Sequence, residues 1–167
     1  FYFKLNGLPV FMKGANWVPA DNFAPRVSNE KYDRMLQEAV SANMNMLRVW
    51  GGGYYESDVF YELCDQYGLF VWQDFMFACA MYPGDPSFTA NVEQEVTQQV
   101  QRLRNHPSIA LWCGNNEIAE GWNNWGWQKE YRLNSTDSSK IDADYESLFN
   151  GLIPGLLSVL DPPRPYI

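Results

Sequence analysis

The residues best suited to chemistry stand together at the end of one apolar run. Ser108-Ile-Ala-Leu-Trp-Cys113 has the length and composition of a buried strand, and Gly-Asn-Asn-Glu117 follows it directly. A carboxylic acid placed there can give or take a proton, and a neighbouring amide can hydrogen-bond a hydroxyl group of a ligand. Glu117 is therefore a candidate general acid/base, and Asn116 is a candidate binding residue. The alternative is that Glu117 only caps the helix that follows.

Two further candidates stand where other apolar runs end. Trp50 closes the run that begins at Asn45, and its ring can either offer an apolar face to a ligand or fill the core. Asp74 closes the run that begins at Leu69, and its carboxylate can bind a hydroxyl group or pair with Arg48. Arg48 needs such a partner because an unpaired buried charge is costly.

Weaker candidates follow in the same regions of the sequence. Trp17 and Asp21 come after the first apolar run and are candidates for lining the same cleft. Glu120 lies one helical turn beyond Glu117, and we expect it at the surface or rim.

Strand-like and helical patterns alternate four times along the chain. The runs predicted as buried strands are residues 10–16, 45–50, 69–74 and 108–117. Apolar residues recur at helical spacing between them, with Ser28 as an N-cap, Gly68 at a helix end, and Val92, Val96, Val100 and Leu103 along one face. The alternation predicts an α/β fold with a parallel sheet, and both a doubly wound sheet and a (β/α)8 barrel satisfy it.

The ends of the chain and its length predict part of a barrel. Asn6-Gly7 favours a tight hairpin turn after Phe1–Leu5, and the segment 161–167 has the character of the start of another strand. A complete (β/α)8 barrel, or TIM barrel, needs eight strands and about 250 residues. We therefore expect one unit over residues 1–167: the N-terminal half of a barrel, about four βα units plus a lead-in hairpin.

Two features are also predicted for the part of the chain that follows the fourth strand-like run. Pro154 is expected to kink or restart the last helix. Residues 134–139, which are all polar and include three serines, are expected to form an exposed loop.

The net charge and the residue composition exclude several classes of partner and cofactor. The net charge of −8 argues against nucleic acid as a partner, and no apolar stretch approaches the length of a membrane helix. Cys64, Cys79 and Cys113 each stand in an apolar run, which predicts buried free thiols. The chain has one histidine and no Cys-x-x-Cys pair, which argues against a zinc site, so no metal or cofactor is expected.

Four longer motifs resemble the β-mannosidases of glycoside hydrolase family 2, and the resemblance covers nearly the whole chain. The motifs are Gly14-Ala-Asn-Trp-Val-Pro-Ala-Asp21, Leu47-Arg-Val-Trp-Gly-Gly-Gly53, Trp72-Gln-Asp-Phe-Met-Phe-Ala-Cys79 and Arg104-Asn-His-Pro-Ser-Ile-Ala-Leu-Trp-Cys-Gly-Asn-Asn-Glu117. The Asn-Glu ending is common to a broad clan of retaining glycosidases, whereas the second and third motifs are more particular to the mannosidases.

The resemblance implies a retaining exo-β-mannosidase that removes terminal β-linked mannose from oligosaccharides. It assigns Glu117 as the acid/base, Asn116 as a partner of the sugar 2-hydroxyl, and the ring of Trp50 as a platform for the mannose. It also implies that β-sandwich domains precede the barrel and that the nucleophile is a second glutamate on a later strand, beyond Ile167. The fragment alone is then expected to be inactive and, with open strand edges, to self-associate.

The sequence also allows other functions and another binding site. A non-catalytic carbohydrate-binding or scaffold relative is one alternative, and β-galactosidase, β-glucuronidase and exo-glucosaminidase specificities within the same family are others. The tryptophan-rich loop 122–127 is suited to a leaving-group subsite or to packing against another domain. Related enzymes are lysosomal in animals and often periplasmic or secreted in bacteria, and the resemblance implies the same compartments for this protein.

Overall fold

A short hairpin precedes the main sheet. The computed structural model describes residues 2–167, so Phe1, where the predicted hairpin started, lies outside the described residues. Strands β1 (Phe3–Leu5) and β2 (Leu8–Val10) pair antiparallel. Asn6 and Gly7 join them at φ values of 52° and 83°, the left-handed conformations that a tight hairpin turn requires. The predicted turn is confirmed.

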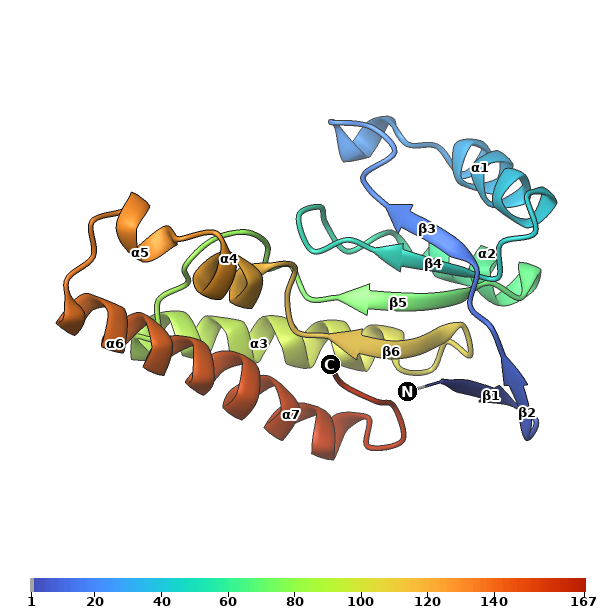
Figure 1. The fold of residues 1–167 in the computed structure, drawn as a ribbon. Coiled ribbons are helices and arrows are strands. Elements are labelled where there is room, and N and C mark those ends of the chain that lie inside the picture. Colours follow the sequence, from blue (N-terminus) through green and yellow to red (C-terminus); the bar gives the residue numbers. More distant parts are fainter. Residues whose placement is uncertain (1) are drawn as a thin grey trace.

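Four parallel strands form the main sheet, in chain order. They are β3 (Gly14–Trp17), β4 (Met46–Val49), β5 (Phe70–Asp74) and β6 (Ile109–Cys113), and Figure 1 shows them side by side. A doubly wound sheet would reverse its strand order partway, whereas sequential order is the order of a barrel. The sheet is thus a partial (β/α)8 barrel.

The predicted strand at 10–16 is wrong in its boundaries. Val10 pairs antiparallel with Phe3 in the hairpin, whereas Gly14 pairs in parallel with Met46 in the main sheet. The chain therefore changes partners between these residues, and one apolar run becomes two strands. Gly14 lies so close to β4 that an added Cβ would stand 1.7 Å from the carbonyl oxygen of Met46.

Three long helices follow the first three strands of the sheet. They are α1 (Asn29–Ser41), preceded by the short 3₁₀ turn η1 (Ala24–Arg26), α2 (Asp58–Tyr67) and α3 (Pro86–Leu103). The Ser28 hydroxyl caps α1 by accepting from the Lys31 amide, and Gly68 ends α2 at φ 69°. The predicted apolar face of α3 is buried along its length.

Further helical segments follow β6. They are α4 (Ile118–Asn124), α5 (Trp127–Glu130), α6 (Ser135–Tyr145), the π-helical segment η2 (Glu146–Leu152) and α7 (Ile153–Leu160). Pro154 lies in the first turn of α7, so the predicted restart is confirmed. The predicted loop at 134–139 is wrong: Asn134 accepts from the Asp137 amide and caps α6, which begins at Ser135.

The two faces of the main sheet differ. Side chains on one face, including Val49, Val71 and Trp112, pack with the buried faces of the helices in a single core. The other face presents Asn16, Arg48 and Trp72 to an open hollow of about 360 Å³. This division matches a barrel, in which helices cover the outside and alternate strand residues face the interior.

The end of the chain returns to β6. The amide of Trp112 donates to the carbonyl of Pro165 and the amide of Ile167 donates to the carbonyl of Trp112, at 3.0 and 3.1 Å. Tyr166 and Trp112 form a parallel bridge, as expected for the start of another strand. Across residues 2–167, every helix is too short or too polar to span a lipid bilayer.

Candidate active site

Glu117 lies where β6 gives way to α4, at the C-terminal edge of the sheet. Its backbone adopts the left-handed conformation, with φ 60°, and its side chain is exposed. Although Glu117 occupies the N-cap position of α4, its side chain makes no capping hydrogen bond. The carboxylate therefore does not cap the helix, which was the alternative to a role as general acid/base.

Two groups donate to one oxygen of the Glu117 carboxylate. Asn116 Nδ2 lies 3.1 Å from Glu117 Oε2, and the Cys79 thiol lies 3.4 Å from the same oxygen. Asn116 is 5% exposed, and its backbone N–H donates to the backbone carbonyl of Phe77 at 2.9 Å. The loop after β5 therefore fixes the segment that carries Glu117.

A partly buried ion pair connects this segment to the sheet. Arg48 donates to both oxygens of Asp74, at 3.1 and 2.9 Å, and its Nη2 also donates to Asn116 Oδ1 at 3.0 Å. Asp74 is fully buried and accepts two more hydrogen bonds, from Trp72 Nε1 at 2.8 Å and from the Gly51 amide at 2.9 Å. The structure thus places Asp74 in the ion pair with Arg48, the second of the two roles weighed for it.

Trp50 lies at the end of β4, beside the glycine-rich turn at 51–53. Its side chain is half-buried, and its ring covers Gly52 so closely that an added Cβ there would lie 2.0 Å from a ring atom. Trp50 is not among the buried residues of the core, whereas Trp112, on β6, is fully buried. The ring therefore lies at the rim of the sheet.

Trp17 and Asp21 lie apart from the Glu117 cluster. Side chains alternate along β3, so Asn16 faces the hollow while Trp17 turns to the helices, where it is 7% exposed. Its indole packs on Phe60 at 4.9 Å and donates to Glu56 at 2.8 Å. In this structure Trp17 is a core residue, not a residue lining a cleft.

Asp21 organises its own loop. Its Oδ1 accepts from the Phe23 amide at 3.0 Å, and its other oxygen lies 3.8 Å from both Arg26 and Lys31. The Phe23 hydrogen bond, followed by these two cations, lowers the pKa of Asp21. The hydrogen-bond and ion-pair partners described for Asp21 belong to residues 23–31.

Cys79 is a site residue that the sequence did not reveal. The prediction of buried thiols is confirmed for Cys64 and Cys113 but wrong for Cys79, which is exposed. A left-handed backbone, with φ 48°, turns Cys79 out of its apolar run and toward Glu117. Burial raises the pKa of Cys113 to about 11. Partial desolvation, and then the hydrogen bond to Glu117, raise the pKa of Cys79.

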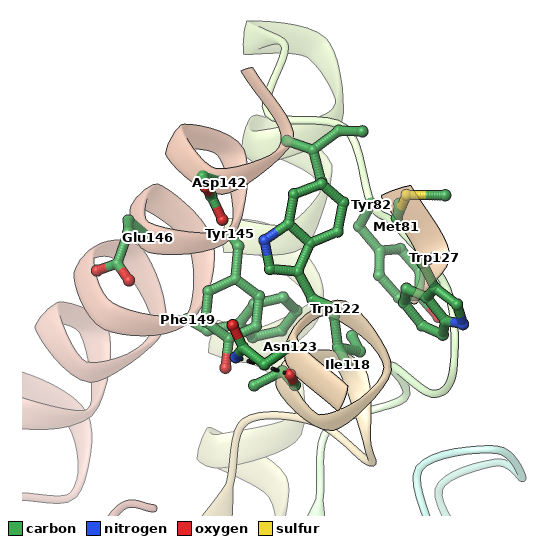
Figure 2. A pocket seen from close by; sticks show the side chains of 12 residues that line it. Met81, Tyr82, Ile118, Trp122, Asn123, Trp127, Asp142, Tyr145, Glu146 and Phe149 are labelled. Atoms are coloured by element: carbon green, nitrogen blue, oxygen red, sulfur yellow. Dashed lines mark hydrogen bonds between the residues drawn. The ribbon is translucent and has the colours of Figure 1, made fainter. Parts of the chain in front are cut away.

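A pocket of about 170 Å³ adjoins the site on the side of α4. Figure 2 shows the indole of Trp122 standing between Tyr145 on one side and Met81 and Tyr82 on the other. Trp127 also lines the pocket, whereas Trp125 is 48% exposed. The predicted loop 122–127 is therefore two short helices, α4 and α5, that place two of its three tryptophans around one cavity.

Comparison with known sequences points to one family. Residues 2–141 match the model of glycosyl hydrolases family 2, TIM barrel domain. The chain is 49% identical to a β-mannosidase of Mus musculus over 100% of this chain and 18% of that protein. It is 60% identical to a β-mannosidase of Capra hircus over 73% of this chain and 14% of that protein. The chain thus spans less than a fifth of the length of these curated relatives.

Solved structures agree with the sequence comparison. A β-D-mannosidase from Dictyoglomus thermophilum is similar with a TM-score of 0.87 and 49% identity, over 99% of this chain and 19% of that one. A β-glucuronidase from Bacteroides uniformis has a TM-score of 0.83 at 23% identity, over 99% of this chain and 19% of that one, and shows the shared fold alone. With sequential parallel strands and a carboxylate at their C-terminal edge, the chain belongs to glycosyl hydrolase family 2, as part of its TIM barrel domain.

Proposed function

We propose that this chain is part of the catalytic barrel of a retaining exo-β-mannosidase, with Glu117 as the general acid/base. The observation that carries the proposal is the exposed Glu117 carboxylate beside buried Asn116, in a chain 49% identical over its whole length to a β-mannosidase. The substrate is then a β-mannoside or an oligosaccharide with a terminal β-linked mannose.

The proposed reaction needs a second carboxylate, a glutamate outside residues 1–167. That glutamate attacks the anomeric carbon while protonated Glu117 donates its proton to the departing glycosidic oxygen. In the second step Glu117 accepts a proton from water, which attacks the same carbon and releases mannose from the enzyme. Two inversions give net retention.

Asn116 is proposed to hold the sugar 2-hydroxyl through its Nδ2 group. Its Oδ1 already accepts from Arg48, so Nδ2 is turned toward Glu117 and the open side of the site. Asp74 is proposed to act one step further back, because it is fully buried and holds the guanidinium that orients Asn116. Asp74 at the end of β5 is thus connected to the sugar through Arg48 on β4 and Asn116 after β6.

Residues 1–167 are proposed to be the N-terminal half of the barrel. The four sequential strands and the 18% coverage of the mouse relative support this division. The other half of the barrel and the preceding β-sandwich domains would then lie elsewhere in the polypeptide. Residues 1–167 alone should not hydrolyse β-mannosides, because they lack the nucleophile.

Replacing Trp50 by alanine in the intact enzyme should lower kcat/KM for aryl β-mannosides by about tenfold or more, with little loss of thermal stability. The half-buried ring lies at the end of β4, so truncation removes a sugar platform rather than core volume. Steady-state kinetics and thermal unfolding test this together. Trp112→Ala is the matched control. Trp112 is fully buried, so its truncation should lower the free energy of unfolding by about 3–5 kcal/mol. A Trp50 variant that unfolds early but retains its kinetics would assign the ring to the core.

A panel of 4-nitrophenyl β-glycosides tests the proposed specificity in the intact enzyme. The mannoside should exceed the galactoside, glucuronide and glucosaminide in kcat/KM by about 10²-fold or more. A site built to bind the axial 2-hydroxyl of mannose leaves polar groups unpaired when the substituent at C2 is equatorial, as it is in the other three sugars. Preference for one of the other sugars would overturn the specificity. Binding of mannosides without hydrolysis of any glycoside would indicate a non-catalytic relative.

A further inference from the structure

Cys79 is tied through its backbone to the segment that carries Glu117. The Cys79 amide donates to the carbonyl of Asn116 at 3.0 Å, and the preceding residue, Ala78, forms a parallel bridge with Asn116. Cys79 and Glu117 both adopt left-handed backbone conformations, with φ of 48° and 60°. Such conformations are uncommon for residues other than glycine, and they turn these two side chains toward each other.

The contacts of the Glu117 carboxylate are asymmetric. The Cys79 thiol and Asn116 Nδ2 both donate to Oε2, at 3.4 and 3.1 Å, and Asn116 Nδ2 also lies 3.5 Å from the Cys79 sulfur. Within the described part of the chain, no hydrogen bond reaches Oε1. One oxygen of the carboxylate is therefore anchored by two donors, and the other is available to a ligand.

We infer that Cys79 is a positioning residue for Glu117, an inference that rests on the proposed acid/base role. The thiol anchors Oε2, so Oε1 is the oxygen that gives its proton to the glycosidic oxygen. An exposed glutamate has several rotamers, and proton donation requires one orientation of its carboxyl group. Two donors on the same oxygen select that orientation before the substrate binds.

The thiol suits this role better than the role of a nucleophile. Partial desolvation and the hydrogen bond to Glu117 raise the pKa of Cys79, which keeps the sulfur protonated and able to donate. Cys64 and Cys113 are buried, so neither offers a thiol to the carboxylate.

A leaving-group series on the intact enzyme tests the inference. Cys79→Ala should lower kcat/KM by about 3- to 10-fold for mannosides with poor leaving groups, and by less than about 2-fold for an activated dinitrophenyl mannoside, because only the former need the positioned acid. Cys79→Ser keeps a donor and should stay within about 2-fold of the unmodified enzyme across the series. Cys79→Gly, which suits the left-handed backbone, is a second donor-free variant should the alanine variant fold poorly.

Each outcome separates this inference from the proposed function. Equal losses on all leaving groups, or a serine variant as impaired as the alanine variant, would overturn the positioning role of Cys79. If Glu117→Ala shows strong leaving-group dependence and neither donor-free variant of Cys79 does, only the present inference fails. If Glu117→Ala itself shows no leaving-group dependence, the proposed acid/base role fails with it.

Discussion

Replacing Glu117 by alanine in the intact enzyme should lower kcat/KM for β-mannosides with poor leaving groups by about 10²–10⁴-fold, the usual contribution of general acid catalysis. Activated aryl mannosides should lose far less in the first step, because a stable phenolate departs without a proton. Hydrolysis of the mannosyl-enzyme should then become rate-limiting, since water has lost its base. Steady-state and burst kinetics with matched aryl and alkyl mannosides measure both effects.

Glu120→Ala is the control for this experiment. Glu120 lies one turn along α4, is exposed, and accepts a hydrogen bond from Asn124 on the same helix. Its loss should change kcat/KM by less than about 2-fold, within the usual range for surface substitutions. Equal losses for good and poor leaving groups in Glu117→Ala would point to a structural role for Glu117.

Asp74→Ala should lower the free energy of unfolding by about 3–5 kcal/mol, because it leaves the Arg48 guanidinium uncompensated. Asp74 is fully buried and also fixes the Gly51 amide beside Trp50, so catalysis should fall together with stability. Chemical denaturation of the intact enzyme, monitored by a spectroscopic probe placed in the barrel domain, measures the loss of unfolding free energy.

The matched control is Asp58→Ala, which breaks an ion pair with Arg102 in which the Asp58 side chain is 64% exposed. This surface pair should contribute less than about 1 kcal/mol. Equal stability losses in the two variants would contradict the structural role of Asp74. A raised KM with unchanged stability in Asp74→Ala would instead support direct binding of a sugar hydroxyl.

Local signals in the sequence predicted the elements well where one interaction decides the structure. A serine before a helical pattern can satisfy free amides, and Ser28 does so. Glycine tolerates the left-handed conformation, and Gly68 ends α2 in that way. The apolar face of α3 is buried because the helical period brings its apolar residues to one side.

Predictions failed where the same residues serve two kinds of structure. Asn and Ser favour both loops and N-caps, so the segment 134–139 was interpreted as a loop although Asn134 begins a helix. The run 10–16 has one apolar pattern but two pairing partners: Val10 pairs with nearby Phe3, whereas Gly14 pairs with Met46, more than thirty positions away. No local pattern contains that information.

The candidate site was predictable only in part. Strand ends of a parallel sheet meet at one edge, which was sufficient to bring Glu117, Asn116 and Asp74 into one neighbourhood. Trp17 was expected just after a strand, but it is the last residue of β3, and its side chain faces the helices. Cys79 was missed because its exposure depends on a left-handed backbone conformation that its apolar neighbours do not indicate.

Azide rescue of Glu117→Ala in the intact enzyme tests the central claim most directly. Azide needs no general base and should fit the space left by the missing side chain, so it should restore turnover of an activated aryl mannoside. Because the sugar is then held by the nucleophile in the inverted α configuration, attack by azide should give β-mannosyl azide. Recovery of α-mannosyl azide would contradict the account, because it would identify Glu117 as the nucleophile.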